Sequence, residues 1–218
     1  GNRFEAIEAG GKAEIAGVLG GSGQIQTSSA RARARRALDA YAEDLEATGP
    51  GFADYARAVR YDLDRMIGET QLPPDRICRR LTALGADHPR FGYVRANAAG
   101  AMLELRTLPG FQPARSAPYC PIWALARAGQ TPERAIRQLA AFPNGQRFVL
   151  VARARPTGVA GYAAARHFVT DMLVIGETDA SATVYAADPG LQAEAVGTAC
   201  RICPRESCAL RTEDPISG

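Results

Sequence analysis

The sequence predicts an α+β protein, in which a helical N-terminal region precedes a mostly antiparallel sheet with a few helices and a cysteine-rich C-terminal loop. Apolar residues recur at helical spacing through residues 1–86, whereas from Phe91 onward they alternate or form short runs between turn residues. Three cysteines then fall within residues 200–208. We therefore expect two parts, 1–86 and 87–218, with the boundary near Asp87.

Four helices are expected in the N-terminal part, each with its apolar residues on one face. The glycine-rich segment 20–23 ends the first helix, and Ser28 or Ser29 can cap the second. Pro73 and Pro74 open the fourth. The expected ranges are about 4–19, 28–47, 52–67 and 75–84.

Strands dominate the second part. A first hairpin is expected because alternating residues on both sides flank a turn at 97–100. An irregular loop with four prolines, 108–121, then delivers Cys120 to a short helix that begins at Pro121. A last extended piece begins at Tyr185. The expected strands are 91–95, 102–105, 146–154 and 167–175, and the expected helices are 121–127 and 131–141.

Charge and composition give little support for direct nucleic-acid binding. The net charge is +3, and Lys12 is the sole lysine, so the positive charge is almost all arginine. An arginine and alanine bias of this kind often reflects the composition of the genome. We therefore favour solvated surface arginines over a nucleic-acid-binding surface. The stretch 66–84 resembles a helix-turn-helix element, but a packed helical hairpin is favoured because such hairpins are common.

No apolar stretch is long enough for a membrane span and no signal segment opens the sequence, so we expect a cytoplasmic protein. Because the sequence begins with Gly1 and not Met, we expect a preceding segment in the natural protein. Five cysteines without a secretion signal favour metal binding or simple burial over disulfides. Cys78, on the apolar side of a helix, fits simple burial.

The other four cysteines predict a metal or cluster site. Cys200, Cys203 and Cys208 have the spacing C-x2-C-x4-C, which leaves one ligand short of four, and Cys120 is the natural fourth. One C-x2-C pair with a lone third thiol favours a [4Fe–4S] cluster over zinc, although both accept four thiolates. Cys-Pro pairs at 120–121 and at 203–204 leave a haem or other tetrapyrrole site as a further alternative.

No catalytic constellation is found in the sequence. His88 and His167 are the only imidazoles, and neither has a carboxylate at a telling spacing. The sequence also has no Gly-x-Ser-x-Gly motif, P-loop or dinucleotide fingerprint. We therefore expect a sensor or binding module and not an enzyme.

The sequence resembles the C-terminal half of the short-chain fatty acyl transcriptional regulators, the group that includes propionate- and acetate-metabolism regulators. The resemblance covers roughly 59–215, and its most specific part is the closing cysteine motif. After Trp123 the sequence departs from the family's usual polar, histidine-containing stretch. The motifs are ICRRLTAL at 77–84, FGYVR at 91–95, CPIW at 120–123 and CRICPRESC at 200–208.

The resemblance implies a cytoplasmic regulator with an N-terminal helix-turn-helix domain, which these residues do not show, and a C-terminal domain that senses acyl-CoA. It also implies a [4Fe–4S] cluster held by Cys120, Cys200, Cys203 and Cys208. We expect a homo-oligomer. An acyl-CoA pocket needs arginine beside apolar and aromatic surface. The residues expected to supply it, around the hairpin between two apolar strands, are Arg153, Arg155, Tyr162 and Arg166.

Overall fold

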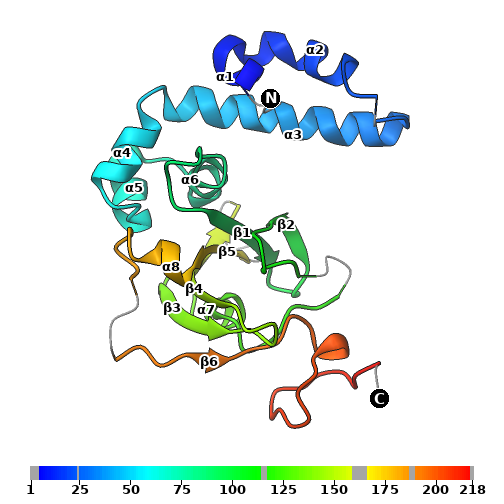
Figure 1. Ribbon diagram of the computed structural model, residues 1–218, viewed down its shortest axis with the longest axis vertical. Helices are drawn as coiled ribbons and strands as arrows, with labels where there is room; N and C mark the ends of the chain where they lie inside the picture. Colours follow the sequence, from blue (N-terminus) through cyan, green and yellow to red (C-terminus); the bar gives the residue numbers. More distant parts are fainter. Residues whose placement is uncertain (1–4, 24, 114–116, 159–165, 187–189, 217–218) are drawn as a thin grey trace. The chain divides into compact units, whose positions relative to one another are not determined.

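The computed structural model describes residues 5–23, 25–113, 117–158, 166–186 and 190–216 (Figure 1). The chain divides into two compact units. The first consists of Gly1–Val59 and Leu63–Ala83, and the second of Arg60–Asp62 and Leu84–Gly218. The α+β class predicted from the sequence is confirmed, because helices make up the first unit and a mostly antiparallel sheet the second.

The helical unit is built around the long helix α3. Thr27 caps this helix, since its hydroxyl oxygen accepts a hydrogen bond from the backbone N–H of Ala30 (3.2 Å). The first helices pack on α3 around a core of Ile7, Ile15, Leu19, Tyr41 and Ala42. The helices are α1 (Glu5–Gly10), the 3-10 turn η1 (Gly11–Glu14), α2 (Ile15–Gly20), α3 (Ser28–Thr48), α4 (Phe52–Ala58), α5 (Leu63–Thr70) and α6 (Pro74–Leu81).

Two of the expected helices are interrupted, so the prediction of continuous helices over 4–19 and 52–67 was wrong. The first breaks at Gly11, which adopts a φ of 64°. The second breaks at Arg60 and Tyr61, with φ values of 53° and 59°. A left-handed residue cannot continue a right-handed helix, so the chain turns at each of these points.

The second unit contains a six-stranded sheet in the order β2-β1-β5-β4-β3-β6. Every pairing is antiparallel except that of β3 with β6, which is parallel. The four expected strands are confirmed as β1, β2, β4 and β5. The elements of this unit are β1 (Phe91–Asn97), β2 (Met102–Arg106), α7 (Ala124–Gln130), β3 (Ile136–Ala141), β4 (Arg147–Thr157), β5 (His167–Gly176), α8 (Glu177–Ala180), β6 (Glu194–Ala195) and the 3-10 turn η2 (Cys200–Ile202).

Helix α7 covers one face of the sheet, and the main apolar core lies between them. Trp123, Leu125 and Ala128 contribute from the helix side, and all three are fully buried. The facing strand residues, Val94, Ala96, Leu150, Ala152, Met172 and Val174, share the α7 side of the sheet. Cys120 belongs to the same core and lies four residues before the start of α7.

The expected helix 131–141 was wrong, because residues 136–141 form strand β3. Glu133 has a φ of 68°, which prevents a helix from starting at Thr131. The segment then pairs along its whole length with β4, from Ile136 opposite Ala152. Cross-strand pairing has overridden a pattern that suits either structure.

Smaller differences occur nearer the C-terminal loop. The short helix begins at Ala124 and not at Pro121, and α8 and β6 were not predicted. Tyr185 lies in a turn and not in an extended piece, and residues 187–189, which follow it, lie outside the described residues. None of these differences changes the class of the fold.

Candidate metal centre

Cys120 lies at the end of the irregular loop, four residues before Ala124, the first residue of α7. Its side chain is buried, with 5% of the residue exposed. The Cys120 carbonyl accepts a hydrogen bond from the N–H of Trp123 (3.1 Å), which closes a tight turn over Pro121. Trp123 is itself fully buried in the core beneath the sheet. The position of Cys120 is therefore set by the buried apolar core of this unit.

The C-terminal segment reaches the same place by pairing with the sheet edge. Strand β6 runs parallel to β3, and the N–H of Val196 then donates to the carbonyl of Ala141 (3.0 Å). The next residue, Gly197, donates its N–H to the Cys120 sulfur (3.3 Å) and accepts at its carbonyl from Trp123 Nε1 (2.8 Å). Gly197 is thus the point at which the two cysteine-bearing segments meet.

The structure brings all four predicted cysteines to the wall of one small cavity. Cys203 is buried like Cys120, whereas Cys200 and Cys208 are partly exposed. Among the described residues, no three Cys, His, Asp or Glu side chains already have the arrangement that a metal ion would require. The four cysteines therefore line one cavity, but no three of them already surround a single metal position. The cavity lining is Cys120, Pro121, Ile122, Gly197, Ala199, Cys200, Cys203, Arg205, Cys208 and Arg211.

The protein environment acts differently on the two thiols whose pKa is shifted. Burial raises the pKa of the Cys120 thiol, and the nearby Cys200 and Cys203 raise it further. Hydrogen bonds from the N–H groups of Gly197 and Ile122 act in the opposite direction, but they are outweighed. At Cys200, partial burial is outweighed by hydrogen bonds from Thr212 and Glu213 and by the charge of Arg211, so its pKa is lowered. Cys200 is therefore the readier of the two to act as a thiolate ligand.

The donor set suits a group that takes four thiolates. Two cysteine-bearing segments supply the sulfurs, and backbone N–H groups already point at two of these sulfurs, as at many thiolate-bound clusters. Arg205 also has its Nε atom buried with no hydrogen-bond acceptor among the described residues. A buried charged N–H without an acceptor is costly, so a negatively charged group in the adjoining cavity would satisfy it. The residues present therefore fit a [4Fe–4S] cluster, and they fit a four-cysteine zinc ion as well.

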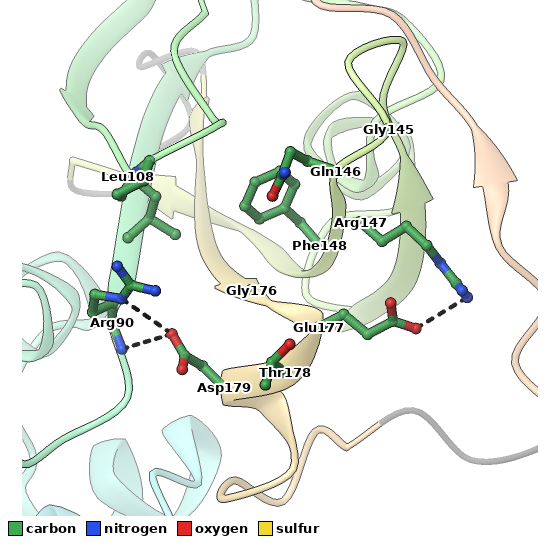
Figure 2. Close-up of a pocket in the computed structure, with 11 residues that line it drawn as sticks. Arg90, Leu108, Gly145, Gln146, Arg147, Phe148, Gly176, Glu177, Thr178 and Asp179 are labelled. Atoms are coloured by element: carbon green, nitrogen blue, oxygen red, sulfur yellow. Dashed lines mark hydrogen bonds and ion pairs between the residues drawn. The ribbon is translucent and has the colours of Figure 1, made fainter.

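A second cavity lies between the start of β4 and the end of β5 (Figure 2). Its volume is about 390 Å³, and Leu108 and Phe148 form its apolar part. Two ion pairs border it, Arg90 with Asp179 (3.5 Å) and Arg147 with Glu177 (3.0 Å). Of the residues expected to bind an effector, the three that the structure describes, Arg153, Arg155 and Arg166, do not line this cavity. We find no signal in the sequence that predicts it.

The residues expected to bind an effector are only partly brought together. Arg153 and Arg166 are exposed, and Tyr162 lies outside the described residues. Arg155 donates from Nε to Asp171 (2.9 Å), whose carboxylate is almost fully buried. Tyr93 also donates a hydrogen bond from its hydroxyl to Asp171, and Arg95 lies 3.8 Å from the same carboxylate. Tyr93, Arg95 and Arg155 thus surround the buried Asp171 carboxylate, an arrangement that the sequence did not predict.

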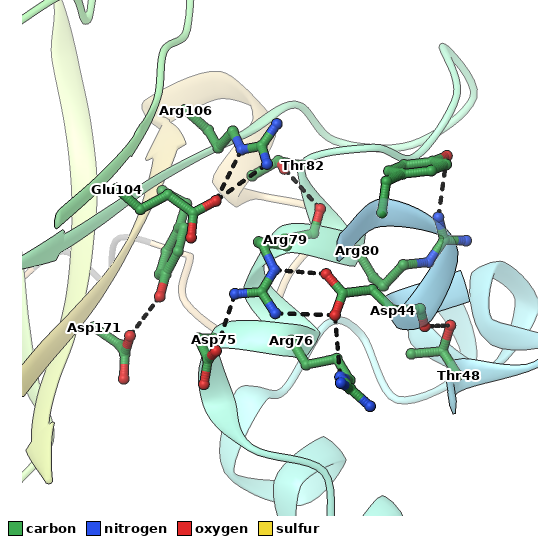
Figure 3. A network of polar contacts seen from close by, with 12 residues as sticks. Asp44, Thr48, Asp75, Arg76, Arg79, Arg80, Thr82, Glu104, Arg106 and Asp171 are labelled. Atoms are coloured by element: carbon green, nitrogen blue, oxygen red, sulfur yellow. Dashed lines mark hydrogen bonds and ion pairs between the residues drawn. The ribbon is translucent and has the colours of Figure 1, made fainter. Parts of the chain in front are cut away.

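In the helical unit, the arginines of α6 contact Asp44 of α3 (Figure 3). Arg79 binds both carboxylate oxygens, at 2.5 and 2.9 Å, and Arg76 approaches one of them at 3.0 Å. Arg79 also binds Asp75, four residues earlier on the same helix, at 2.9 Å. These contacts give the two arginines a structural role within the unit, which supports a packed hairpin over a DNA-reading element at 66–84.

Comparison with known proteins shows the family to which the chain belongs. Residues 81–218 match the family model described as the short-chain fatty acyl coenzyme A regulator, C-terminal, and the chain therefore belongs to this family of transcriptional regulators. All four cysteines of the cavity lie within the matched residues.

Individual relatives agree with this family. The chain is 33% identical over 172 residues to the propionyl-CoA carboxylase regulator of Cereibacter sphaeroides, covering 76% of this chain and 37% of that protein. It is 29% identical over 171 residues to the HTH-type transcriptional regulator PrpR of Mycobacterium tuberculosis, covering 75% of this chain and 35% of that protein. The chain thus spans little more than a third of the length of these curated relatives.

A solved structure, described as a Mycobacterium tuberculosis transcriptional regulator, superposes with a TM-score of 0.84. It is 26% identical in sequence, and the match covers 99% of this chain and 68% of the other. The likeness therefore extends over the helical unit as well as the sheet. In the part of the chain that the structure describes, no helix has both the length and the apolar character needed to cross a membrane.

Proposed function

We propose that this chain is the effector-sensing part of a transcriptional regulator, that Cys120, Cys200, Cys203 and Cys208 hold a [4Fe–4S] cluster, and that the effector is a short-chain acyl-CoA. One observation carries the cluster proposal: thiols from two segments far apart in the sequence line a single cavity. The effector class is supported by the family's description. DNA would be bound by a part of the regulator outside this chain.

The cluster is preferred to zinc because of how the cysteines are distributed. Structural zinc sites are commonly built from two close pairs of ligands, whereas this chain has one C-x2-C pair, a third thiol five residues later and a remote fourth. Four thiolates in such an arrangement suit a cubane cluster. When bound, the cluster would supply one-electron redox chemistry, and the protein's own residues would hold the loop and limit solvent access.

The positive charge of the arginines is the reason for assigning them to the effector site. An acyl-CoA carries phosphate groups, which guanidinium groups bind well. Arg153 is exposed on β4, opposite Asp171 on β5, and Arg155 is held in place by the same carboxylate. An effector alters a regulator only when it binds two conformations unequally, so binding here would favour one conformation of the sheet unit. We propose no catalytic role for these residues.

Metal analysis of the purified protein tests the cluster. After anaerobic reconstitution we expect about four iron atoms and four acid-labile sulfides per chain. Replacement of Cys120, Cys200, Cys203 or Cys208 by alanine should remove most of the iron. Cys78→Ala is the matched control, since Cys78 is fully buried in α6 of the helical unit and should not affect iron content. Zinc alone in the wild type, or the sharp absorption band of haem, would overturn the cluster proposal.

Titration calorimetry with acetyl-, propionyl- and butyryl-CoA tests the effector. We expect at least one of them to bind, and we expect Arg153→Ala and Arg155→Ala to weaken binding about tenfold each, since a hydrogen bond to a charged group is worth roughly 1.5–3 kcal/mol. Arg134→Ala is the control, because Arg134 is an exposed arginine in the turn before β3. Absence of binding by all three thioesters would contradict the effector proposal.

A further inference from the structure

Two arginines line the cysteine cavity together with the four thiols. Arg211 donates from Nη1 to the carbonyl of Cys200 (3.1 Å) and from Nη2 to the carbonyl of Arg205. Its guanidinium therefore bridges the two sides of the loop that contains Cys200, Cys203 and Cys208. A loop without regular secondary structure needs such partners for its carbonyl groups.

Arg205 connects this loop to the rest of the unit. Its Nη2 donates to the carbonyl of Val196 (3.2 Å), and the N–H of Val196 donates to Ala141 at the end of β3. The residue after Val196 is Gly197, which holds the Cys120 sulfur. Hydrogen bonds, together with the side chains and the peptide bond that join them, thus connect Cys200 through both arginines to the segment that positions Cys120. Every bond in this series joins groups of the protein alone.

The two arginines also place positive charge beside the thiols. Guanidinium groups stay protonated at all ordinary pH values. A cubane cluster with four thiolate ligands has a net negative charge in its oxidised form and one further negative charge in its reduced form. Positive charge at the cavity wall stabilises the reduced form more strongly, which raises the reduction potential.

We infer that Arg205 and Arg211 are positioning residues of the cysteine site, which hold the loop 200–208 in place before any cluster is present and raise the reduction potential of the proposed cluster by their charge. The second half of this inference rests on the proposed cluster, whereas the first half does not. Arg201 offers the matched comparison within the same loop. It is 56% exposed, lies 3.8 Å from Glu213, and does not line the cavity.

Hydrogen exchange of the metal-free protein tests the first half. Arg211→Lys and Arg205→Lys keep the charge but cannot reproduce the bridging geometry. Amides at 197–203 should exchange roughly tenfold faster in both variants than in the wild type, which is the effect of losing one to two net hydrogen bonds. Arg201→Lys should exchange like the wild type. Unchanged exchange in Arg211→Lys, or an equal increase in Arg201→Lys, would overturn the positioning role.

The midpoint potential of the reconstituted protein tests the second half. Arg205→Ala and Arg211→Ala should lower the potential, Arg211→Lys should lie closer to the wild type because the charge is kept, and Arg201→Ala should not change it. A potential in Arg205→Ala and Arg211→Ala equal to that of the wild type would overturn the charge effect. Failure of the wild type to assemble any cluster would instead refute the proposed function, and the exchange experiment would still decide the positioning role.

Discussion

Gly197 donates its backbone N–H to the sulfur of Cys120 over a separation of 77 residues in the sequence, at 3.3 Å. The same peptide segment accepts the indole N–H of Trp123. Because Trp123 is anchored in the core between α7 and the sheet, the cysteine site shares its framework with the most buried part of the unit. Substitution of Gly197 or Trp123 should therefore affect both the positions of the thiols and the stability of the sheet unit.

Replacement of Gly197 by alanine should impair cluster assembly. The added Cβ would lie 2.8 Å from the Cys203 sulfur, so the Cys203 thiol must shift, whereas the 3.9 Å to the Cys120 sulfur is an ordinary contact. Overpacking of this kind typically costs about 1–3 kcal/mol. We expect less than half of the wild-type iron content after reconstitution, together with a lower midpoint of thermal unfolding.

Gly129→Ala provides the control for this substitution. A Cβ at this position, in helix α7, would meet only Thr170 Oγ1 at 3.6 Å, which is an ordinary contact. Alanine is also favoured over glycine within a helix by about 0.5–1 kcal/mol. Gly129→Ala should therefore keep full iron content. Normal iron content in Gly197→Ala would show that the close approach of Gly197 to the thiols is not needed.

Trp123→Phe should destabilise the sheet unit by about 1–3 kcal/mol, because the buried carbonyl of Gly197 would lose its hydrogen-bond donor. Urea unfolding followed by far-ultraviolet circular dichroism measures this effect. Tyr119→Phe is the control, since the Tyr119 ring stacks on Trp123 with centroids 6.0 Å apart and the substitution keeps that ring. Equal stability losses in the two variants would argue against the Gly197 contact as the cause.

The strands were predictable from the sequence where the spacing of apolar residues suits a strand and does not suit a helix. The apolar run Phe148–Val151 and the similar run in β5 have no polar face, which is typical of strands buried on both sides. Residues 136–141 were misassigned because Ile136, Leu139 and Ala140 have spacings that also suit a helix. Their strand structure depends on pairing with β4, which local sequence does not encode.

The cysteine set was predictable from count and spacing, and the structure brings all four to one cavity. The residues that organise the cavity were not predictable. Gly197 is one of 22 glycines, and nothing adjacent to it in the sequence indicates its approach to Cys120. Arg205 and Arg211 looked like ordinary members of an arginine-rich chain. Their role depends on which carbonyl groups the folded loop presents to them.

Asp44→Ala should destabilise the helical unit by about 3 kcal/mol. Asp44 has a side-chain exposure of 3% and holds both Arg76 and Arg79 (Figure 3). Removal of one partner of a buried ion pair typically costs about 3–5 kcal/mol, and partial solvation of the two arginines favours the lower end. Urea unfolding, with hydrogen exchange resolved for α3 and α6, measures the loss.

Asp54→Ala is the matched control for Asp44→Ala. Asp54 is 90% exposed and lies 3.8 Å from Arg57, so its ion pair should contribute about 0–1 kcal/mol at most. A loss in Asp44→Ala no greater than that of the control would mean that the Asp44 ion pairs contribute little to stability.

The stability of the helical unit should fall at high pH because of Tyr41. Burial raises the pKa of Tyr41 to about 12, supported by its hydrogen bond to Glu8 (2.5 Å) and opposed by the charge of Arg80. The unfolded chain releases this proton near a pH of about 10, so above that pH the unfolded state binds fewer protons than the folded state. The contribution of Tyr41 is therefore complete below a pH of about 10 and is lost as the pH rises through about 12. Tyr41→Phe should flatten this part of the curve when urea unfolding is measured across it, and an unchanged slope would assign the loss to other groups.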